Sequence, residues 1–200
     1  MKKRSYGEGY ELTIIDKLGI YLSNQKIINY VRKFKPRRII DIGCGYQALL
    51  LVQLRKYNAD LTGVDVKIDK KISGVKLIQK KISKDLSFLE SNSTDLVVMN
   101  SVLEHLDYPL LILKEIYRIM DTNSMLILNV PNWIGKFFLE FSAFKLRLSP
   151  IEEVNDHKMY YDKRDIWPLL IQAGFKPINI NISYHKFFLN TISFSAKRIQ

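Results

Sequence analysis

The chain has 200 residues, 47% of them hydrophobic, which suits one compact domain that buries roughly 70% of the surface of its unfolded chain. Its single cysteine excludes an internal disulfide, and neither a signal peptide nor an apolar stretch of the roughly 20 residues needed to span a membrane is present. The net charge of +11 is spread through a lysine-rich chain, so it favours a solvated or anion-attracting surface over a dedicated nucleic-acid site. We therefore expect a single cytoplasmic domain, residues 1–200.

Strands and helices are predicted to alternate along most of the chain. The N-terminal segment, residues 1–35, carries a helical pattern over residues 25–34, and Pro36 ends that helix. Short apolar runs then predict strands, and helical patterns lie between most of them, notably over residues 47–56 and 109–120. The predicted strands are residues 39–42, 61–66, 75–78, 96–100 and 125–130. This alternation predicts a parallel sheet with helices on both faces.

The C-terminal part departs from this alternation. A helix over residues 162–173 is expected to close at Gly174, and two strands follow at residues 175–183 and 186–197. Only a short turn near His185 separates them, so they must pair antiparallel, because a parallel pair needs a long crossover. We therefore expect a mostly parallel α/β sheet that finishes in an antiparallel hairpin.

The most informative stretch is residues 37–51, RRIIDIGCGYQALLL, which predicts a buried strand, a glycine turn and the start of a helix. Gly43 and Gly45 allow the backbone to approach a ligand where a side chain would block it. Asp65 ends the next strand, twenty residues after Gly45, where an acid can bind ribose hydroxyls. The pattern predicts a nucleotide-type cofactor.

Two cofactor classes fit this turn. Gly43, Gly45 and Ala48 satisfy the loose dinucleotide pattern of nicotinamide or flavin oxidoreductases. Asp41 favours the other class, because an acid there sits poorly beside a pyrophosphate but suits a cofactor with an ammonium or sulfonium group.

The motifs IIDIGCGY, GVDV and DLVVMNSVLEHL, in this order, resemble the class I S-adenosylmethionine-dependent methyltransferases, and within them the small-molecule, methyltransferase type 11-like group. The resemblance covers roughly residues 27–197. It implies a Rossmann-like fold with a seven-stranded, mostly parallel sheet, helices on both faces and a C-terminal antiparallel hairpin. It also implies S-adenosyl-L-methionine as the cofactor and no metal.

The resemblance assigns roles to individual residues. Asp65 would hold the ribose hydroxyls, Val66 would lie against the adenine, and Asn100 would close the site near the methionine end. Four further residues would surround the methionine part: Asp41, Gly43, Cys44 and Gly45. For Cys44, a purely steric role in a tight turn is an equal alternative.

The chain departs from the family pattern at three places. Gln47 stands where a third glycine is common in the family. Ile82 stands where the family often has an acid that contacts adenine, and the next acid, Asp85, lies three residues further along the chain. Residues 121–124 replace a glycine pair, which we expect to be neutral because Asn123 can adopt a left-handed conformation. The first two departures leave open a binding module whose catalytic site has decayed.

Methyl transfer requires alignment of the acceptor, and a hydroxyl acceptor also needs a group to take its proton. His157, before the helix at residues 162–173, and His105, in LEHL, are the candidate catalytic residues. For His105 we favour a helix-start residue that orders the local backbone, and His185 is expected in the hairpin turn.

The acceptor itself is poorly specified. Residues 100–102 lack the proline-proline-aromatic run used for amino groups, so O-methylation is favoured and base methylation on nucleic acid loses support. Residues 132–150 interleave aromatic and basic side chains, which suits a lid over the site or a surface that meets a membrane. A small-molecule or lipid/glycan-linked acceptor fits this pattern, and an RNA methyltransferase and a NAD-type oxidoreductase remain the alternatives.

Overall fold

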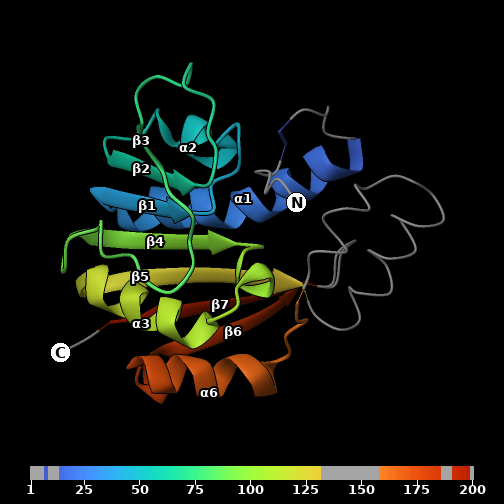
Figure 1. Cartoon of the computed structure of the whole chain (residues 1–200), viewed down its shortest axis with the longest axis vertical. Coiled ribbons are helices and arrows are strands. Elements are labelled where there is room, and N and C mark those ends of the chain that lie inside the picture. Colours follow the sequence, from blue (N-terminus) through green and yellow to red (C-terminus); the bar gives the residue numbers. More distant parts are fainter. Residues whose placement is uncertain (1–6, 9–13, 132–157, 186–190, 199–200) are drawn as a thin grey trace.

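The structure is a computed structural model that describes residues 7–8, 14–131, 158–185 and 191–198 (Figure 1). These residues form one seven-stranded sheet with the order β3-β2-β1-β4-β5-β7-β6. The strands are β1 (Arg38–Ile42), β2 (Asp60–Asp65), β3 (Lys76–Gln79), β4 (Thr94–Asn100), β5 (Met120–Pro131), β6 (Ile180–His185) and β7 (Thr191–Lys197). The first five run parallel, whereas β7 pairs antiparallel with both β5 and β6. The connection between β6 and β7, residues 186–190, lies outside the described residues.

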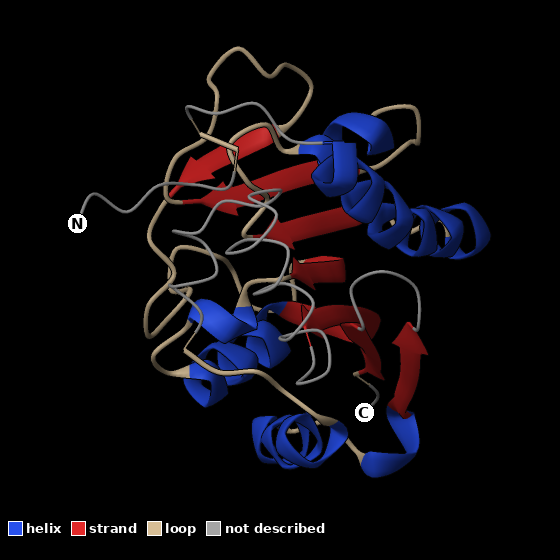
Figure 2. Cartoon of the chain, turned by 90° about the vertical axis from the view of Figure 1, so that its right-hand side faces the viewer, coloured by secondary structure: helices blue, strands red, loops and turns tan. Residues whose placement is uncertain are grey.

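Helices cover both faces of the sheet, so the predicted α/β class is confirmed (Figure 2). Helices α1 (Ile14–Phe34) and α2 (Leu49–Leu54) lie on one face. Helices α3 (Pro109–Ile119) and α6 (Lys163–Ala173) pack together on the other. Two short 3-10 turns, η1 (Leu103–His105) and η3 (Pro177–Asn179), complete the described elements.

The two hydrophobic cores follow from the alternation of side chains along each strand. Ile39 of β1 packs with α1 and α2, whereas its neighbours Ile40 and Ile42 pack with α3 and α6. In β4, Val98 packs in the core on the side of α1 and α2, whereas Met99 packs in the core on the side of α3 and α6. Central strands covered on both faces must be apolar on both, which is why the predicted strands read as almost continuous apolar runs.

The end of helix α1 and the connection of residues 121–124 can be compared with the sequence predictions. Helix α1 ends at Phe34, before Pro36, as expected. Lys35, between them, adopts a left-handed conformation with φ 49°, which is common just after a helix end. The tight connection of residues 121–124 produces a shift in the pairing of β4 with β5, and Asn123 has φ 65°. An asparagine therefore supplies the conformation for which the family often uses glycine.

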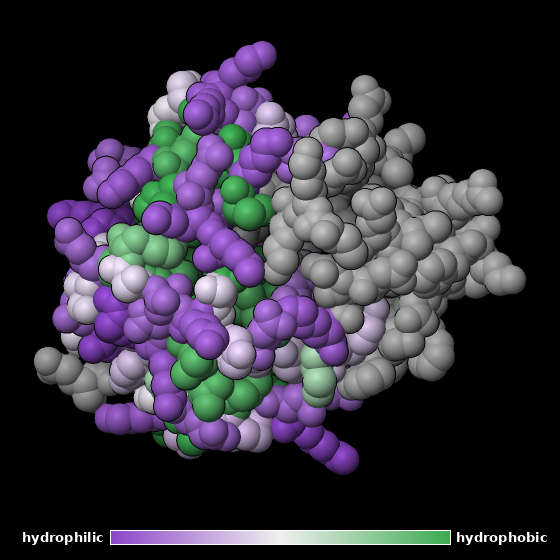
Figure 3. Space-filling view, in the orientation of Figure 1, coloured by the Kyte–Doolittle hydropathy of each residue, from purple (hydrophilic) through white to green (hydrophobic). Residues whose placement is uncertain are grey.

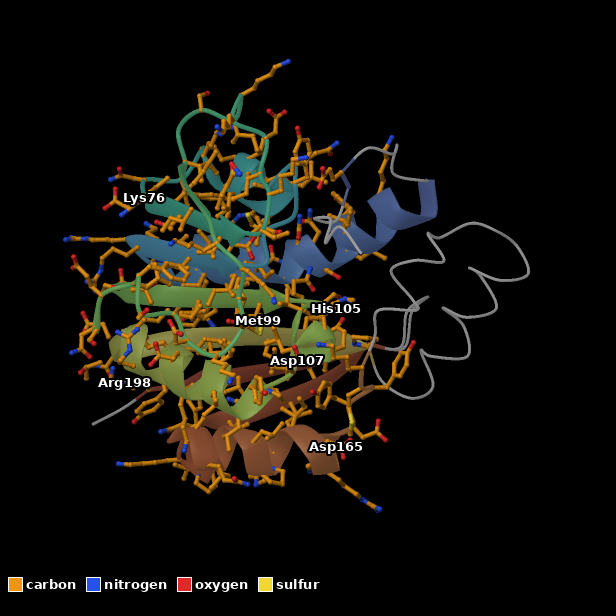
Figure 4. All side chains as sticks on the ribbon, viewed as in Figure 1. Lys76, Met99, His105, Asp107, Asp165 and Arg198 are labelled. Carbon is orange, nitrogen blue, oxygen red and sulfur yellow. The ribbon has the colours of Figure 1, made fainter. Side chains whose placement is uncertain are left out.

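The chain order places the site at one edge of the sheet. From β1 the chain builds outward through β2 to β3, and it then returns to build β4 and β5 on the other side of β1. Ligands of open parallel sheets bind at such a reversal, beyond the carboxyl ends of the strands. His105 and Asp107 lie at the end toward which β4 runs, and Arg198 lies at the opposite end (Figure 4).

The surface of the described residues is mostly hydrophilic in the view of Figure 3, with smaller apolar patches between the polar side chains. No helix in the described part of the chain has both the length and the apolar character needed to cross a membrane.

Candidate functional site

The glycine turn between β1 and α2 is fixed to the neighbouring strand by its own backbone. Gly43 and Gly45 have φ of 78° and 73°, and the N–H groups of Gly43 and Cys44 donate to the carbonyl oxygen of Val64 at 2.7 and 3.2 Å. A Cβ on Gly43 would lie 2.2 Å from Cγ2 of Val102, in the loop after β4. A glycine at position 43 therefore satisfies both the positive φ and the close approach of two loops.

Asp65, at the carboxyl end of β2, is joined to this turn. Its Oδ2 accepts a hydrogen bond from the N–H of Gly45 at 2.8 Å, and its Oδ1 accepts one from the N–H of Val66 at 2.7 Å. A carboxylate offers about four lone-pair sites, so each oxygen can still accept a hydrogen bond from a ligand hydroxyl. Asp65 thus orders the turn and retains the capacity to bind ribose.

Asp41 lies within β1, directly before the turn, and its side chain is almost completely buried, with 3% exposed. Its Oδ1 has no hydrogen-bond partner among the described residues. Burial, with a further contribution from the negative charge of Asp65, raises the pKa of Asp41 to about 7. Two acids beside a glycine turn would be stabilised by a cationic ligand group, so the site fits a ligand with an ammonium or sulfonium.

Cys44 packs closely against β2. A Cβ on Gly63 would lie 3.0 Å from the Cys44 Sγ and 2.8 Å from Cδ1 of Leu51, so this part of the turn has little spare volume. Burial, followed by the charges of Asp41 and Asp65, raises the pKa of the Cys44 thiol. The thiol is therefore protonated at neutral pH, which favours the steric role over a chemical one.

The end of β4 is tied to β5. Oδ1 of Asn100 accepts a hydrogen bond from Nδ2 of Asn129 at 2.8 Å, and Ser101, with φ 54°, donates its N–H to the carbonyl oxygen of Asn129. The sequence prediction included Asn100 but missed Asn129, which is buried in β5. Asn129 is a polar residue within the apolar run of residues 125–130, and this break in the pattern could have indicated a functional residue.

Glu104 in η1 is the second functional candidate that sequence reasoning missed. Its side chain is completely buried, and neither carboxylate oxygen has a hydrogen-bond partner in the described part of the molecule. Burial raises the pKa of Glu104 to about 8. The pKa of Tyr161 rises to about 12, because its phenol is buried and lies within the influence of the Glu104 charge.

The other predicted site residues are less informative. His105 is half-buried beside Glu104, and its backbone N–H donates to the carbonyl oxygen of Val102 at the start of η1, so the role predicted for its side chain stays a prediction. His157 and residues 132–150 lie outside the described residues. His185 was expected in the hairpin turn, but it is the last residue of β6 and pairs with Thr191, because β6 extends further than predicted.

Two departures from the family pattern can also be placed. Gln47 is exposed, so it does not fill the space beneath the turn. Ile82 packs against the core on the α3 side, while Asp85 accepts hydrogen bonds from Ser87. Among the residues described, no group of three or more His, Cys, Asp or Glu side chains is arranged to hold a metal ion.

Comparison with known proteins decides the donor class. A family described as "Methyltransferase domain" matches residues 20–180 of the sequence. The chain belongs to this methyltransferase family. It is an enzyme, and S-adenosyl-L-methionine is its methyl donor. A search of curated proteins finds no match to this methyltransferase.

Solved structures support the fold of the methyltransferase. A SAM-dependent methyltransferase from Archaeoglobus fulgidus superposes with a TM-score of 0.68 at 20% identity, covering 89% of this chain and 94% of its own. The plantazolicin methyltransferase BpumL, solved with a desmethylPZN analogue and SAH, has a TM-score of 0.66 at 15% identity. The match covers 90% of this chain and 84% of BpumL. A possible histamine N-methyltransferase from Thermotoga maritima has a TM-score of 0.56 at 17% identity, with 82% of each chain covered.

The described residues fit this cofactor. S-adenosyl-L-methionine carries an ammonium, a sulfonium and two ribose hydroxyls, and it supplies a methyl group on an already activated sulfur. The turn offers a buried unpartnered oxygen on Asp41 among the described residues, and the Asp65 carboxylate beside the turn can accept hydrogen bonds from ligand hydroxyls. The contribution of the chain is then to orient the donor and acceptor and to exclude water.

Proposed function

We propose that this methyltransferase transfers the methyl group to a hydroxyl oxygen of a small-molecule or lipid/glycan-linked acceptor, and that it does so in the cytoplasm. In this proposal Asp65 holds the ribose hydroxyls, Asp41 binds the methionine ammonium, and the backbone at residues 43–45 closes around the methionine part. The pair of acids at the glycine turn is the observation that carries this donor assignment.

The strand order supports a direction for the donor across the sheet. Asp65 ends β2, on the β3 side of β1, whereas Val102 contacts the turn from the β4 side. A donor whose ribose lies at Asp65 would extend its adenine toward Val66 and β3. Its methionine end would lie over Asp41 and beside Asn100, which leaves the ends of β4 and β5 for the acceptor.

The preference for oxygen rests on the loop after β4. Residues 100–102 are Asn, Ser and Val, without the proline-proline-aromatic run used for amino groups. A hydroxyl acceptor needs a group that takes its proton, and His105 and Glu104 both lie in this loop. His157 stays a prediction for the same role. The aromatic and basic residues of the segment 132–150 support an acceptor held at a membrane surface.

The donor is tested by thermal unfolding with S-adenosylmethionine, its demethylated product and NAD in parallel. A ligand at about 100 times its dissociation constant adds about 2.7 kcal/mol to the free energy of unfolding. We expect stabilisation by the first two ligands and none by NAD, and the opposite result would refute the donor assignment.

The acceptor is tested by transfer of a labelled methyl group into a fractionated cell extract. We expect label in the aqueous small-molecule or lipid fraction, in a product that mass spectrometry identifies as a methyl ether. Label recovered in RNA, or on an amine nitrogen, would show that O-methylation of this class of acceptor is wrong.

A further inference from the structure

Glu104 is a buried acid that the donor assignment leaves without a role. Its side chain is 0% exposed, and its two oxygens lack hydrogen-bond partners within the described residues. An unpaired buried carboxyl group is costly, whether the group is ionised or neutral. Each such group needs an explanation, and a catalytic role is one that fits an acid in the loop after β4.

The position of Glu104 is on the acceptor side. It follows β4 in the loop whose Val102 contacts the glycine turn, and its backbone carbonyl accepts a hydrogen bond from the N–H of Lys158 at 2.8 Å. Three residues later, the N–H of Tyr161 donates to the carbonyl oxygen of Pro131 at the end of β5. The segment 158–161 thus bridges the loop after β4 and the end of β5, and Glu104 lies beneath it.

We propose that Glu104 is the catalytic residue that takes the proton of the acceptor hydroxyl. The inference rests on the proposed O-methylation and names the proton acceptor of that same site. The acceptor oxygen forms a bond to the methyl carbon as the sulfur–methyl bond breaks, the sulfur keeps that electron pair, and the hydroxyl proton passes to the Glu104 carboxylate.

The groups around Glu104 favour a role as proton acceptor over a permanent ion pair with a lysine. Lys158, the nearest lysine in the covering segment, is hydrogen-bonded to Asp107. Tyr161 lies close enough for the Glu104 charge to raise the pKa of its phenol, and Asp165 of α6 acts on Tyr161 in the same direction. Among the described residues, the titratable or charged groups that neighbour Glu104 in the chain or are linked to it by a contact are His105, Asp107, Lys158 and Tyr161.

The strength of the base also suits a hydroxyl. The pKa of Glu104 is about 8, whereas a phenol titrates near 10, so proton transfer from a phenol to Glu104 is only moderately uphill. A carboxylate of ordinary pKa would be a much weaker base. Phenolic or enolic hydroxyls are therefore the acceptors that this base matches best.

The test uses the full chain, labelled S-adenosylmethionine and a probe panel of catechol, 4-nitrophenol, benzyl alcohol and benzylamine. The variants are Glu104→Gln, which keeps the shape of the side chain, and Glu90→Gln, a control on an exposed acid before β4. Turnover is measured against pH, affinity for the demethylated donor by calorimetry, folding by thermal unfolding, and protonation of the buried carboxyl by infrared difference spectroscopy.

We expect wild-type turnover of a phenolic probe to rise with pH and level off above about pH 8. Glu104→Gln should lower this turnover by about 100-fold or more, because general bases contribute about that factor. The remaining turnover should rise with pH up to the pKa of the phenol itself, near 10, instead of levelling off above about pH 8. Donor affinity should stay unchanged, and the variant should unfold at no lower temperature than wild type, because it loses a buried carboxyl whose pKa is raised in the folded state. The infrared band of the protonated Glu104 carboxyl should disappear. Glu90→Gln should behave as wild type in every measurement.

Several results would overturn the proposal. A Glu104→Gln protein that methylates hydroxyl probes like wild type would show that O-methylation stands but that Glu104 is not the base. Wild-type protein that methylates only benzylamine would instead overturn O-methylation itself. A wild-type protein that, loaded with the demethylated donor, binds none of the hydroxyl probes would overturn the role of Glu104, while its donor affinity would leave the donor assignment intact.

Discussion

The proposed donor side and the proposed acceptor side of this methyltransferase each contain a buried acid with an unpartnered oxygen among the described residues, but Asp41 and Glu104 are held differently. Asp41 lies within a central parallel strand, next to a turn whose N–H groups are bound by Val64 and Asp65. Glu104 lies in a short 3-10 turn, covered by a segment more than fifty residues away in the sequence, which contacts it through the N–H of Lys158. Donor recognition is therefore local in sequence, whereas the acceptor side is assembled from distant segments.

The electrostatic surroundings differ in the same way. The pKa of Asp41 is raised by burial and also by the charge of Asp65, so a cation at the turn would relieve an unfavourable interaction between two acids. The pKa of Glu104 is raised by burial alone. One side thus suits a positively charged ligand group, and the other suits a neutral group that gives up a proton.

The largest expected effect comes from Gly43→Ala on the donor side. The new Cβ would lie 2.2 Å from Val102 and the residue would have φ 78°, so the loops after β1 and β4 must separate. We expect a loss of about 1–2 kcal/mol from the left-handed conformation and a further 1–3 kcal/mol from overpacking, together with loss of donor binding.

Gly74→Ala is the matched control for this substitution. Gly74 also has a positive φ, of 69°, but its nearest side-chain atom to a new Cβ would be 3.8 Å away, on Arg55. In denaturant unfolding, Gly74→Ala should lose only the free energy that the left-handed conformation costs an alanine, and the variant should still bind the donor. Equal effects at the two glycines would show that contact between the two loops is unimportant.

Asp65→Ala should have the next largest effect, chiefly on donor binding. The variant removes the acceptor of the Gly45 N–H and the proposed partner of the ribose hydroxyls. Hydrogen bonds to charged groups contribute about 1.5–3 kcal/mol, so calorimetry should show donor affinity lowered by about 10- to 100-fold. Asp60→Ala, at the exposed opposite end of β2, should leave the affinity unchanged. If Asp65→Ala binds the donor as tightly as wild type does, Asp65 does not hold the ribose hydroxyls.

Asp41→Asn should produce an effect on stability that depends on pH. The native pKa of about 7 lies above the unfolded value of 3.8, so the folded state binds the proton more tightly and wild-type stability falls as pH rises between these values. Each pKa unit corresponds to about 1.4 kcal/mol, so Asn should be stabilising at pH 8, with the advantage fading toward pH 4.

Donor binding by Asp41→Asn should change in the opposite direction. Because the ammonium needs the ionised acid, wild-type affinity should increase up to about pH 7, whereas the variant should bind more weakly with a flatter pH profile. Denaturant unfolding and calorimetry at both ends of this range measure the two effects. A variant whose affinity follows the wild-type pH profile would exclude Asp41 as the ammonium partner.

These differences also explain what could be read from the sequence. The glycine turn, Asp41 and Asp65 lie within or directly beside strands whose apolar pattern predicts them, so their positions at one edge of the sheet follow from the parallel order. The starts and ends of the first four strands are predicted to within two residues, but β5 begins earlier than expected because it includes the irregular pairing at residues 121–124.

The missed residues are those whose environment depends on tertiary contacts. Glu104 stands between a leucine and a histidine in LEHL, and nothing local distinguishes a buried acid there from an exposed one. Its burial depends on η1 packing beneath the segment 158–161, a contact that no periodicity predicts. Asn129 was missed for a similar reason, because its partner Asn100 is specified only by the register of β4 and β5.

The smallest effect is expected from Cys44→Ala. Burial and the charges of Asp41 and Asp65 raise the pKa of the thiol, so it has no nucleophilic role at neutral pH, and alanine fits the space beside Gly63. Loss of one buried sulfur should lower the free energy of unfolding by about 1 kcal/mol and leave donor affinity nearly unchanged. Because Cys44 is the only cysteine in the sequence, labelling by a thiol reagent reports on this position alone. Labelling should be slow in the folded protein and fast after unfolding, whereas rapid labelling of the folded protein would show that the turn is open and that the steric role of Cys44 is wrong.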